Sequence, residues 1–165
     1  MNIINQFSYP LISVGVLVIA YVTLTRVLNA RWYITTFTQL ALVGVFASGF
    51  FLLRPTSTPV DSVEEALATI HNGRPTFVAF FSQYCTVCLT IRPIVDDLVQ
   101  EIEADYDVLQ IDIHNPLGRG LRQRLGFSFT PEFVLYNIDG EEIWRDHAPP
   151  TASLLNQLSG LCESC

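Results

Sequence analysis

The sequence contains no lysine, and its first 60 residues contain no aspartate or glutamate. All nine basic residues are arginine, and all sixteen acidic residues lie from Asp61 onward. Residues 1–60 therefore carry three arginines and a formal charge of +3, whereas residues 61–165 carry six arginines against sixteen acids, or −10. A region of that charge repels nucleic acid and anionic lipid, so we expect neither as a main ligand.

Charged residues are scarce overall, at 15% of 165 residues, while 50% are hydrophobic. This composition is too apolar for a disordered chain or an average soluble protein. The length leaves room for one compact domain with additional segments. We therefore expect a single domain joined to a membrane part.

Two long apolar runs account for this composition. Residues 10–29 contain one charge, Arg26, and residues 34–53 contain none. Each run is long enough to cross the ~30 Å hydrocarbon core as a helix. The short break between them predicts a hairpin of two transmembrane helices, with residues 1–54 as a membrane anchor in the lipid bilayer. A single anchor with one misassigned segment is the alternative.

Basic residues indicate the orientation of this hairpin. The first 25 residues contain no arginine, which disfavours a secretory signal peptide. Arg26 and Arg31 lie at the turn and Arg54 follows the second run. Because basic loops tend to stay in the cytoplasm, the pattern predicts a cytoplasmic turn and both termini outside.

A short proline-rich stretch, residues 55–59, is typical of a tether, and a domain over residues 60–161 follows. Hydrophobic spacing predicts its elements in chain order: helix 63–70, strand 76–82, helix 85–102, strand 108–113, helix 117–125, strand 132–138, strand 141–145 and a helix opened by Thr151. The strand at 76–82 is apolar on both faces and should be central. This order requires an α/β fold with a mixed sheet between helices.

Cys85 and Cys88 form a C-x-x-C motif where the central strand ends and a helix begins. Helix-start N–H groups stabilise a thiolate at Cys85, and Cys88 lies one turn further along the same face. The spacing alone also fits half a zinc site, but two further ligands at zinc-finger spacing are missing, which favours redox chemistry. We expect Cys85 to be the more acidic and the more exposed thiol.

Thr130-Pro131 opens the strand that leads into the hairpin. An X-Pro bond at such a place can be cis, and an ordinary edge-strand proline is the alternative.

The run FVAFFSQYCTVC, Pro93, Thr130-Pro131 and the terminal hairpin and helix together resemble the thioredoxin family over about residues 60–161. The resemblance implies that Cys85 attacks and Cys88 resolves, and that Pro131 is a cis-proline facing them. It implies that Thr130 offers its backbone to a bound peptide and that Tyr84 stands where the family usually has tryptophan. Substrates would be protein thiols or disulfides, with no cofactor and no metal.

Within the family, the anchor and the motif are most similar to anchored proteins of cyanobacteria and chloroplasts. This resemblance implies an extracytoplasmic domain on the cell or thylakoid membrane, a membrane electron donor, a role in cytochrome assembly, and possible membership of a larger membrane complex. The sequence departs from the family pattern where Thr86-Val87 replaces Gly-Pro, and proton transfer is affected where Ala79 replaces a buried acid and Gln110 replaces the lysine that accompanies it. Water or a partner group must then accept the proton of Cys88, and the direction of electron flow stays open.

Cys162 and Cys165 form a second C-x-x-C at the C-terminus, in residues 162–165. A redox relay with Cys85-Cys88, a passive tail disulfide and a weak metal clip are all compatible with it. His71, His114 and His147 lie among turn residues and are expected to be solvated side chains.

The sequence favours a membrane-tethered thiol:disulfide oxidoreductase that acts on extracytoplasmic proteins. A structural or assembly subunit, in which the fold is a binding module, is the second hypothesis, because a fold does not determine a function. Metal delivery is the third, and it lacks a convincing ligand set.

Overall fold

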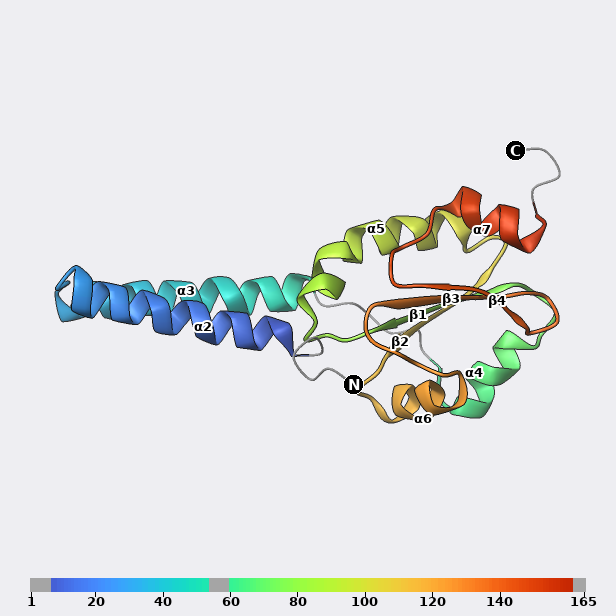
Figure 1. Cartoon of the computed structure of the whole chain (residues 1–165), viewed down its shortest axis with the longest axis horizontal. Helices are drawn as coiled ribbons and strands as arrows, with labels where there is room; N and C mark the ends of the chain where they lie inside the picture. Colours follow the sequence, from blue (N-terminus) through green and yellow to red (C-terminus); the bar gives the residue numbers. More distant parts are fainter. Residues whose placement is uncertain (1–6, 54–59, 162–165) are drawn as a thin grey trace.

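The computed structural model describes residues 7–53 and 60–161. The predicted tether, residues 55–59, and the tail cysteines Cys162 and Cys165 lie outside the described residues. A helical hairpin and an α/β domain follow one another along the longest axis of the molecule (Figure 1).

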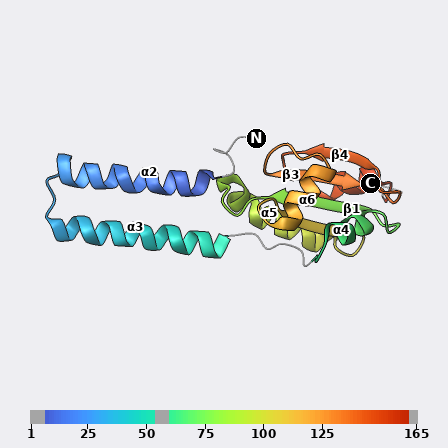
Figure 2. The same ribbon diagram turned by 90° about the horizontal axis from the view of Figure 1, so that it is seen from below.

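The hairpin consists of α2 (Ser8–Val22), which continues as a π-helical segment η1 (Thr23–Val27), and α3 (Trp32–Leu53). The two helices lie side by side and antiparallel (Figure 2). The Tyr9 hydroxyl donates to the carbonyl of Phe46 at 2.6 Å, and the amide of Gln39 donates to the carbonyl of Leu17 at 3.1 Å. These hydrogen bonds satisfy polar groups inside an otherwise apolar pair of helices.

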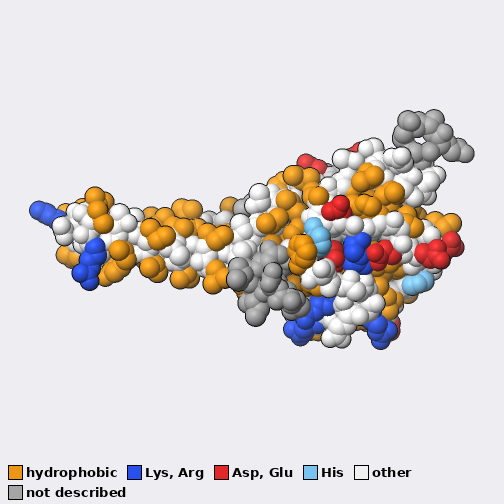
Figure 3. Space-filling model, viewed as in Figure 1, with side chains coloured by type: hydrophobic (Ala, Val, Ile, Leu, Met, Phe, Trp, Pro, Cys, Tyr) orange, Lys and Arg blue, Asp and Glu red, His pale blue; other side chains and the backbone are white. Residues whose placement is uncertain are grey.

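By length and composition, Ser8–Val27 and Trp32–Leu52 could each cross a membrane. The first helix begins two residues before the predicted span of 10–29, and the second two residues before 34–53. Asn29 adopts a positive φ of 46° in the turn between them, a conformation that asparagine tolerates better than most residues. Basic side chains gather at the far tip of the hairpin, around this turn (Figure 3).

The domain is built on a four-stranded sheet with the order β2-β1-β3-β4. Strand β1 (Thr76–Phe81) pairs parallel with β2 (Asp107–Asp112) and antiparallel with β3 (Glu132–Tyr136), and β4 (Glu142–Asp146) pairs antiparallel with β3. All six residues of β1 are buried, because helices cover both faces of this interior strand. The prediction that this strand is central is confirmed.

Two helices cover each face of the sheet (Figure 1). Helices α5 (Thr86–Ile102) and α7 (Ala152–Ser159) pack against one core, and α4 (Val63–Ile70) and α6 (Pro116–Arg124) against the other. Since side chains alternate along a strand, β1 contributes Phe77 and Ala79 to the first core and Val78 and Phe80 to the second. The predicted order of helices and strands and the fold class are confirmed.

Local capping explains where the helices of the domain begin. The Ser62 side chain accepts from the N–H of Glu65 at the start of α4, and Thr151 accepts from the N–H of Leu154 at the start of α7. These caps satisfy donors that a helix leaves unpaired in its first turn. Helix α5 differs, because its N-cap is Cys85 and no side chain of that residue caps the helix.

Candidate redox site

Cys85 lies at the boundary between an extended segment and a helix. Its backbone is extended, with φ −88° and ψ 117°, and its carbonyl accepts the first helical hydrogen bond of α5, from the N–H of Leu89 at 3.1 Å. Cys88 follows in the first turn of the same helix. Both cysteines carry free thiols.

The two thiols have opposite pKa shifts. A hydrogen bond from the Cys88 thiol lowers the pKa of Cys85 from 9.0 to about 6, although burial opposes this shift. The backbone N–H groups of Cys88 and Val87 add to the lowering, as expected at a helix start. The same thiol–thiol hydrogen bond, together with burial, raises the pKa of Cys88. Near neutral pH the pair is therefore a Cys85 thiolate and a Cys88 thiol.

Thr130 lies opposite the cysteines. The residue is 1% exposed, and its side chain lowers the pKa of both cysteines. The Thr130-Pro131 peptide bond is cis, in agreement with the expectation for this proline. The family resemblance pointed to the backbone of Thr130, whereas the pKa shifts of the two cysteines also involve its side chain.

A histidine supports the carbonyl side of the cis-proline. His147 Nδ1 donates to the Pro131 carbonyl at 2.8 Å, and its ring stacks on Phe129 with the centroids 3.7 Å apart. His114 is also partly buried, and its Nε2 lies 3.0 Å from Ser82 Oγ. The expectation of solvated side chains is therefore wrong for these two histidines and holds for the exposed His71. Folding brings each ring against residues far away in the sequence.

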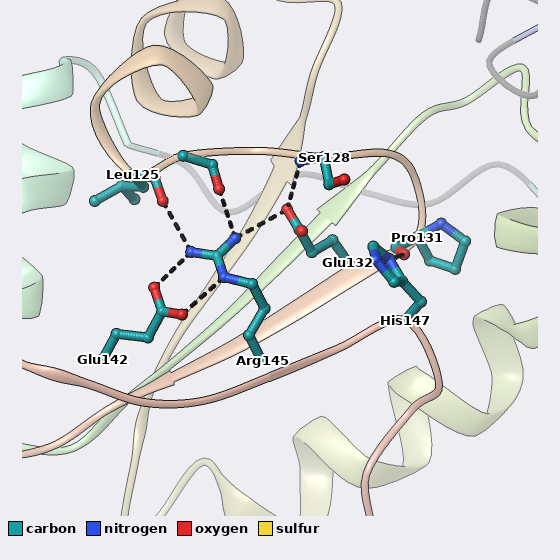
Figure 4. A network of polar contacts seen from close by, with 8 residues as sticks. Leu125, Ser128, Pro131, Glu132, Glu142, Arg145 and His147 are labelled. Carbon is teal, nitrogen blue, oxygen red and sulfur yellow. Dashed lines mark hydrogen bonds and ion pairs between the residues drawn. The ribbon is translucent and has the colours of Figure 1, made fainter. Parts of the chain in front are cut away.

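A buried ion pair holds the loop that precedes the cis-proline (Figure 4). Glu132 is 1% exposed, and Arg145 Nη1 lies 3.1 Å from its carboxylate. Arg145 also binds Glu142 at 2.6 Å, and these contacts raise the pKa of Arg145 and lower that of Glu142. The remaining donors of Arg145 reach the carbonyls of Leu125 and Gly126 at 2.8 and 2.7 Å. One guanidinium thus ties β3, β4 and the loop after α6 together.

The hairpin lies directly on the start of α5. Tyr84 stacks on Phe7, with centroids 5.5 Å apart, and on Phe50, with centroids 6.0 Å apart. The N–H of Tyr9 donates to the carbonyl of Tyr84 at 3.0 Å, and Ser8 Oγ accepts from the N–H of Thr86 at 2.9 Å. The two residues that flank Cys85 are therefore both bound to the hairpin.

Cys85 is 0% exposed and Cys88 is 3% exposed. The expectation that Cys85 is the exposed thiol is therefore wrong. A cysteine at the start of a helix faces solvent when no other segment packs against that end of the helix. In the structure, residues 7–9 bind on both sides of Cys85, and Thr130 and Cys88 close the site from the domain.

Residues 59–159 match the family model for thioredoxin. The chain belongs to the thioredoxin family. Two similar relatives are chloroplastic thioredoxin-like proteins named HCF164. The protein from Oryza sativa subsp. japonica is 27% identical over 105 residues, which are 61% of this chain and 39% of the relative. The protein from Arabidopsis thaliana is 28% identical over 79 residues, 48% of this chain and 29% of the relative. This chain thus spans less than two fifths of either relative.

Among solved structures, oxidised thioredoxin O2 of Arabidopsis thaliana is similar to this chain with a TM-score of 0.50 and 19% identity. The match covers 62% of this chain and 90% of that chain. This likeness supports the thioredoxin fold of the domain.

A small cavity lies beside Cys88 and Ala79, the position where the family resemblance implies a buried acid. Its volume is about 30 Å³, enough for one water, and its lining includes Ala79, Cys88, Gln110 and Pro131. Arg92 and Asp96 also line it. A water here would lie beside the Cys88 thiol.

Sequence reasoning missed the thioredoxin site's contacts with Phe7, Ser8, Tyr9 and Phe50. One signal was available: aromatic residues occur at the start of the first apolar run and at the end of the second. In an antiparallel hairpin these two ends lie together, next to the domain. Among the described residues, no group of three or more His, Cys, Asp or Glu could hold a metal ion.

Proposed function

We propose that this thioredoxin-family protein is a membrane-tethered thiol:disulfide oxidoreductase, with Cys85 as the nucleophile and Cys88 as the resolving thiol. The observation that carries the proposal is the position of the thiol pair, with Cys85 as the N-cap of α5 and Cys88 in the first turn of the same helix. The thiolate is the reactive form in disulfide exchange, and a pKa of about 6 keeps Cys85 in that form at neutral pH.

The reaction would proceed in two exchanges. The Cys85 thiolate attacks one sulfur of a protein disulfide, the substrate S–S bond breaks, and the second substrate sulfur leaves as a thiolate that takes up a proton. Cys88 then loses its proton and attacks Cys85. This step forms the Cys85–Cys88 disulfide and releases the first substrate sulfur as a thiolate. The substrate gains two electrons and the cysteine pair loses two.

Deprotonation of Cys88 is the demanding step, because its pKa is raised. That shift depends mainly on the Cys85 thiolate, which accepts the hydrogen bond from Cys88. Once Cys85 is bonded to the substrate its negative charge is gone, so the pKa of Cys88 falls. A water in the cavity lined by Ala79 and Cys88, or the carboxylate of Asp96 in the same lining, would then accept the proton.

Substrate binding would involve the residues around the sulfur pair. Thr130 and Pro131 lie opposite the cysteines, and a peptide could pair with the backbone there. Tyr84 is 37% exposed and would flank the entering chain. Protein thiols and disulfides are the substrate class that the thioredoxin fold implies.

The location at a membrane rests on the two long apolar helices and on the charges around their turn. Arg26 and Arg31 lie at the tip, and a cytoplasmic tip would place the domain outside the cytoplasm. The resemblance of the anchor and the motif to anchored proteins of cyanobacteria and chloroplasts is the basis for proposing a cell or thylakoid membrane, an electron donor in that membrane and a role in cytochrome assembly, and the two similar relatives are named as chloroplastic. Reporter tags at Met1 and Cys165 should both be accessible from outside, and tags on opposite sides would contradict a two-helix anchor.

Trapping of mixed disulfides tests the catalytic assignment. Cys88→Ser should accumulate partner proteins on Cys85, because the resolving thiol is missing, and Cys85→Ser/Cys88→Ser is the matched control. The reduction potential of the pair would give the direction: a value near about −270 mV favours a reductant and one near about −120 mV an oxidant.

A structural or assembly subunit is the second candidate, and the complete burial of Cys85 is the observation that favours it. A thioredoxin-like module used only for binding has no need of an accessible thiol. Under that hypothesis Cys88→Ser traps nothing, and the Cys85–Cys88 pair exchanges with no protein disulfide even after the hairpin contacts are removed.

A further inference from the structure

The contacts between the hairpin and the domain concentrate around one functional group. Thr86 and Tyr84 lie on either side of Cys85, and both are bound by residues 7–9 at the start of α2. The sulfur between them has no exposed surface. A disulfide can exchange only with a sulfur that it touches, so an external protein has no access to Cys85 in this arrangement.

The hydrogen bond from Thr86 to Ser8 has a specific position. Thr86 is the first residue of α5, and its N–H is one of the donors that a helix leaves free at its start. The Cys85 sulfur uses the backbone N–H groups of Cys88 and Val87 instead. Ser8 therefore caps the helix without displacing the donors that stabilise the thiolate. The site is covered while its electrostatics are kept.

Tyr84 forms the second half of this contact. Its ring stacks on Phe7, the N-cap of α2, and on Phe50 from α3, so both helices of the hairpin meet at the residue before Cys85. The His114 ring closes the aromatic group, with centroids 5.2 Å from Phe7 and 5.5 Å from Tyr84. A residue expected to meet substrate is thus occupied by the protein's own hairpin.

A further contact holds the hairpin to α5 at a distance from the sulfur. Arg92 Nη1 donates to the carbonyl of Leu52 at the end of α3, at 3.0 Å, and its Nε pairs with Asp96 at 3.1 Å. This contact ties α3 to α5 and does not involve residues 7–9.

We propose that residues 7–9 are a built-in plug of the redox site, which must leave Tyr84 and Thr86 before Cys85 can exchange with a protein disulfide. The plug residues belong to the hairpin, so a partner that engages the hairpin opens the site and a freely soluble disulfide meets it closed. The proposal rests on the proposed redox function for its biological meaning, but whether residues 7–9 close the Cys85 site can be measured separately.

The test compares three forms of the full chain in detergent micelles, each also carrying Cys162→Ser and Cys165→Ser so that only the site cysteines react. These forms are the otherwise unchanged chain, the plug variant Phe7→Ala/Ser8→Ala, and the control Leu11→Ala/Ile12→Ala. The control residues are exposed on the same helix, at 55% and 52%. Iodoacetamide labelling of reduced Cys85 is followed against pH, and reduction of insulin disulfides is followed with dithiothreitol as electron donor.

The pH profile separates access from acidity. The midpoint reports the thiol pKa, whereas the plateau at high pH reports how often the sulfur is open. We expect the plateau rate of the plug variant to rise by about tenfold or more, since a closed site reacts only in its open fraction, with the control unchanged. Insulin reduction should rise in the same order.

Equal plateau rates in all three forms would overturn the plug. If labelling rises while no form reduces insulin, the plug stands and the redox function fails. If all three forms reduce insulin equally fast and label equally fast, the redox function stands and the plug fails. The single variant Phe7→Ala, which keeps the Ser8–Thr86 hydrogen bond, repeats the comparison if circular dichroism shows that the double variant is unfolded.

Discussion

Replacing Cys88 tests the origin of the acidity of Cys85. The drop of the Cys85 pKa from 9.0 to about 6 corresponds to roughly 4 kcal/mol in favour of the thiolate, at about 1.4 kcal/mol per pH unit. The hydrogen bond from the Cys88 thiol is the largest contribution. Cys88→Ala removes this donor, whereas Cys88→Ser keeps a hydroxyl at the same place.

We expect Cys88→Ala to raise the Cys85 pKa by at least about one pH unit, because the loss of one charge-assisted hydrogen bond is of that size. The thiolate fraction at pH 7 would then fall from about nine tenths to about one half or less. Cys88→Ser should stay near the unchanged chain. The difference in the Cys85 pKa between the two variants separates the loss of the hydrogen-bond donor from the loss of the second sulfur.

The ultraviolet absorbance of the thiolate, titrated from pH 4 to pH 10, measures this pKa without requiring access to the buried sulfur. Cys162→Ser/Cys165→Ser removes the other two thiols from the signal. Identical midpoints for Cys88→Ala and Cys88→Ser would refute the hydrogen-bond origin. A midpoint near 9 in the unchanged chain would refute the acidity itself.

Three further predictions follow from the site and its supports. Because Cys85 holds its proton less tightly in the folded than in the unfolded chain, the reduced protein should gain stability as pH rises from about 6 to 9 and lose it as pH falls through 6; urea unfolding of Cys85→Ser should lack this dependence. Arg145→Ala should lower the free energy of unfolding by about 3–5 kcal/mol, because it leaves the carboxylate of Glu132 buried without its cation. Glu142→Gln, at a carboxylate that is 39% exposed, should cost about 1 kcal/mol or less, so equal costs in urea unfolding would contradict the ion-pair account. A chain ending at Leu161 keeps the hydrogen bond from the N–H of Leu161 to the carbonyl of Asn156 and should unfold with an unchanged free energy. If this shortened chain is no longer reduced by the membrane donor but still exchanges with dithiothreitol, Cys162 and Cys165 form a relay. If it keeps both reactions, the tail is passive.

Most of the domain was predictable because its signals are local. The six-residue apolar run of β1, the caps Ser62 and Thr151, and the turn at Gly140 are each set by neighbours within a few positions. One helix connects β1 to β2 and another connects β2 to β3, and short connections of this kind leave few possible topologies. The roles of Cys85 as helix cap and Cys88 as the inner thiol follow from the same local pattern.

The accessibility of the site was not predictable in this way. Ser8 and Thr86 lie 78 positions apart, and their contact depends on how the hairpin meets the start of α5. The hydrophobic spacing of neither segment predicts the contact between the hairpin and the start of α5. The exposed Cys85 expected from a helix start is therefore buried, and Tyr84 faces the hairpin's aromatic residues.

The residues that hold the cis-proline loop also show which features are visible in the sequence and which depend on the fold. Pro131 and its turn-like context are visible in the sequence, but His147 and Arg145 reach the loop only because β4 folds back beside β3. The sequence by itself determined a thioredoxin-type sheet, a reactive cysteine at a helix start and two apolar helices ahead of it, since hydrophobic spacing and capping act over a few residues. Only the tertiary structure decided that Thr130 lies opposite the cysteines and that the hairpin covers them, because contacts between distant segments depend on the packing of the whole chain.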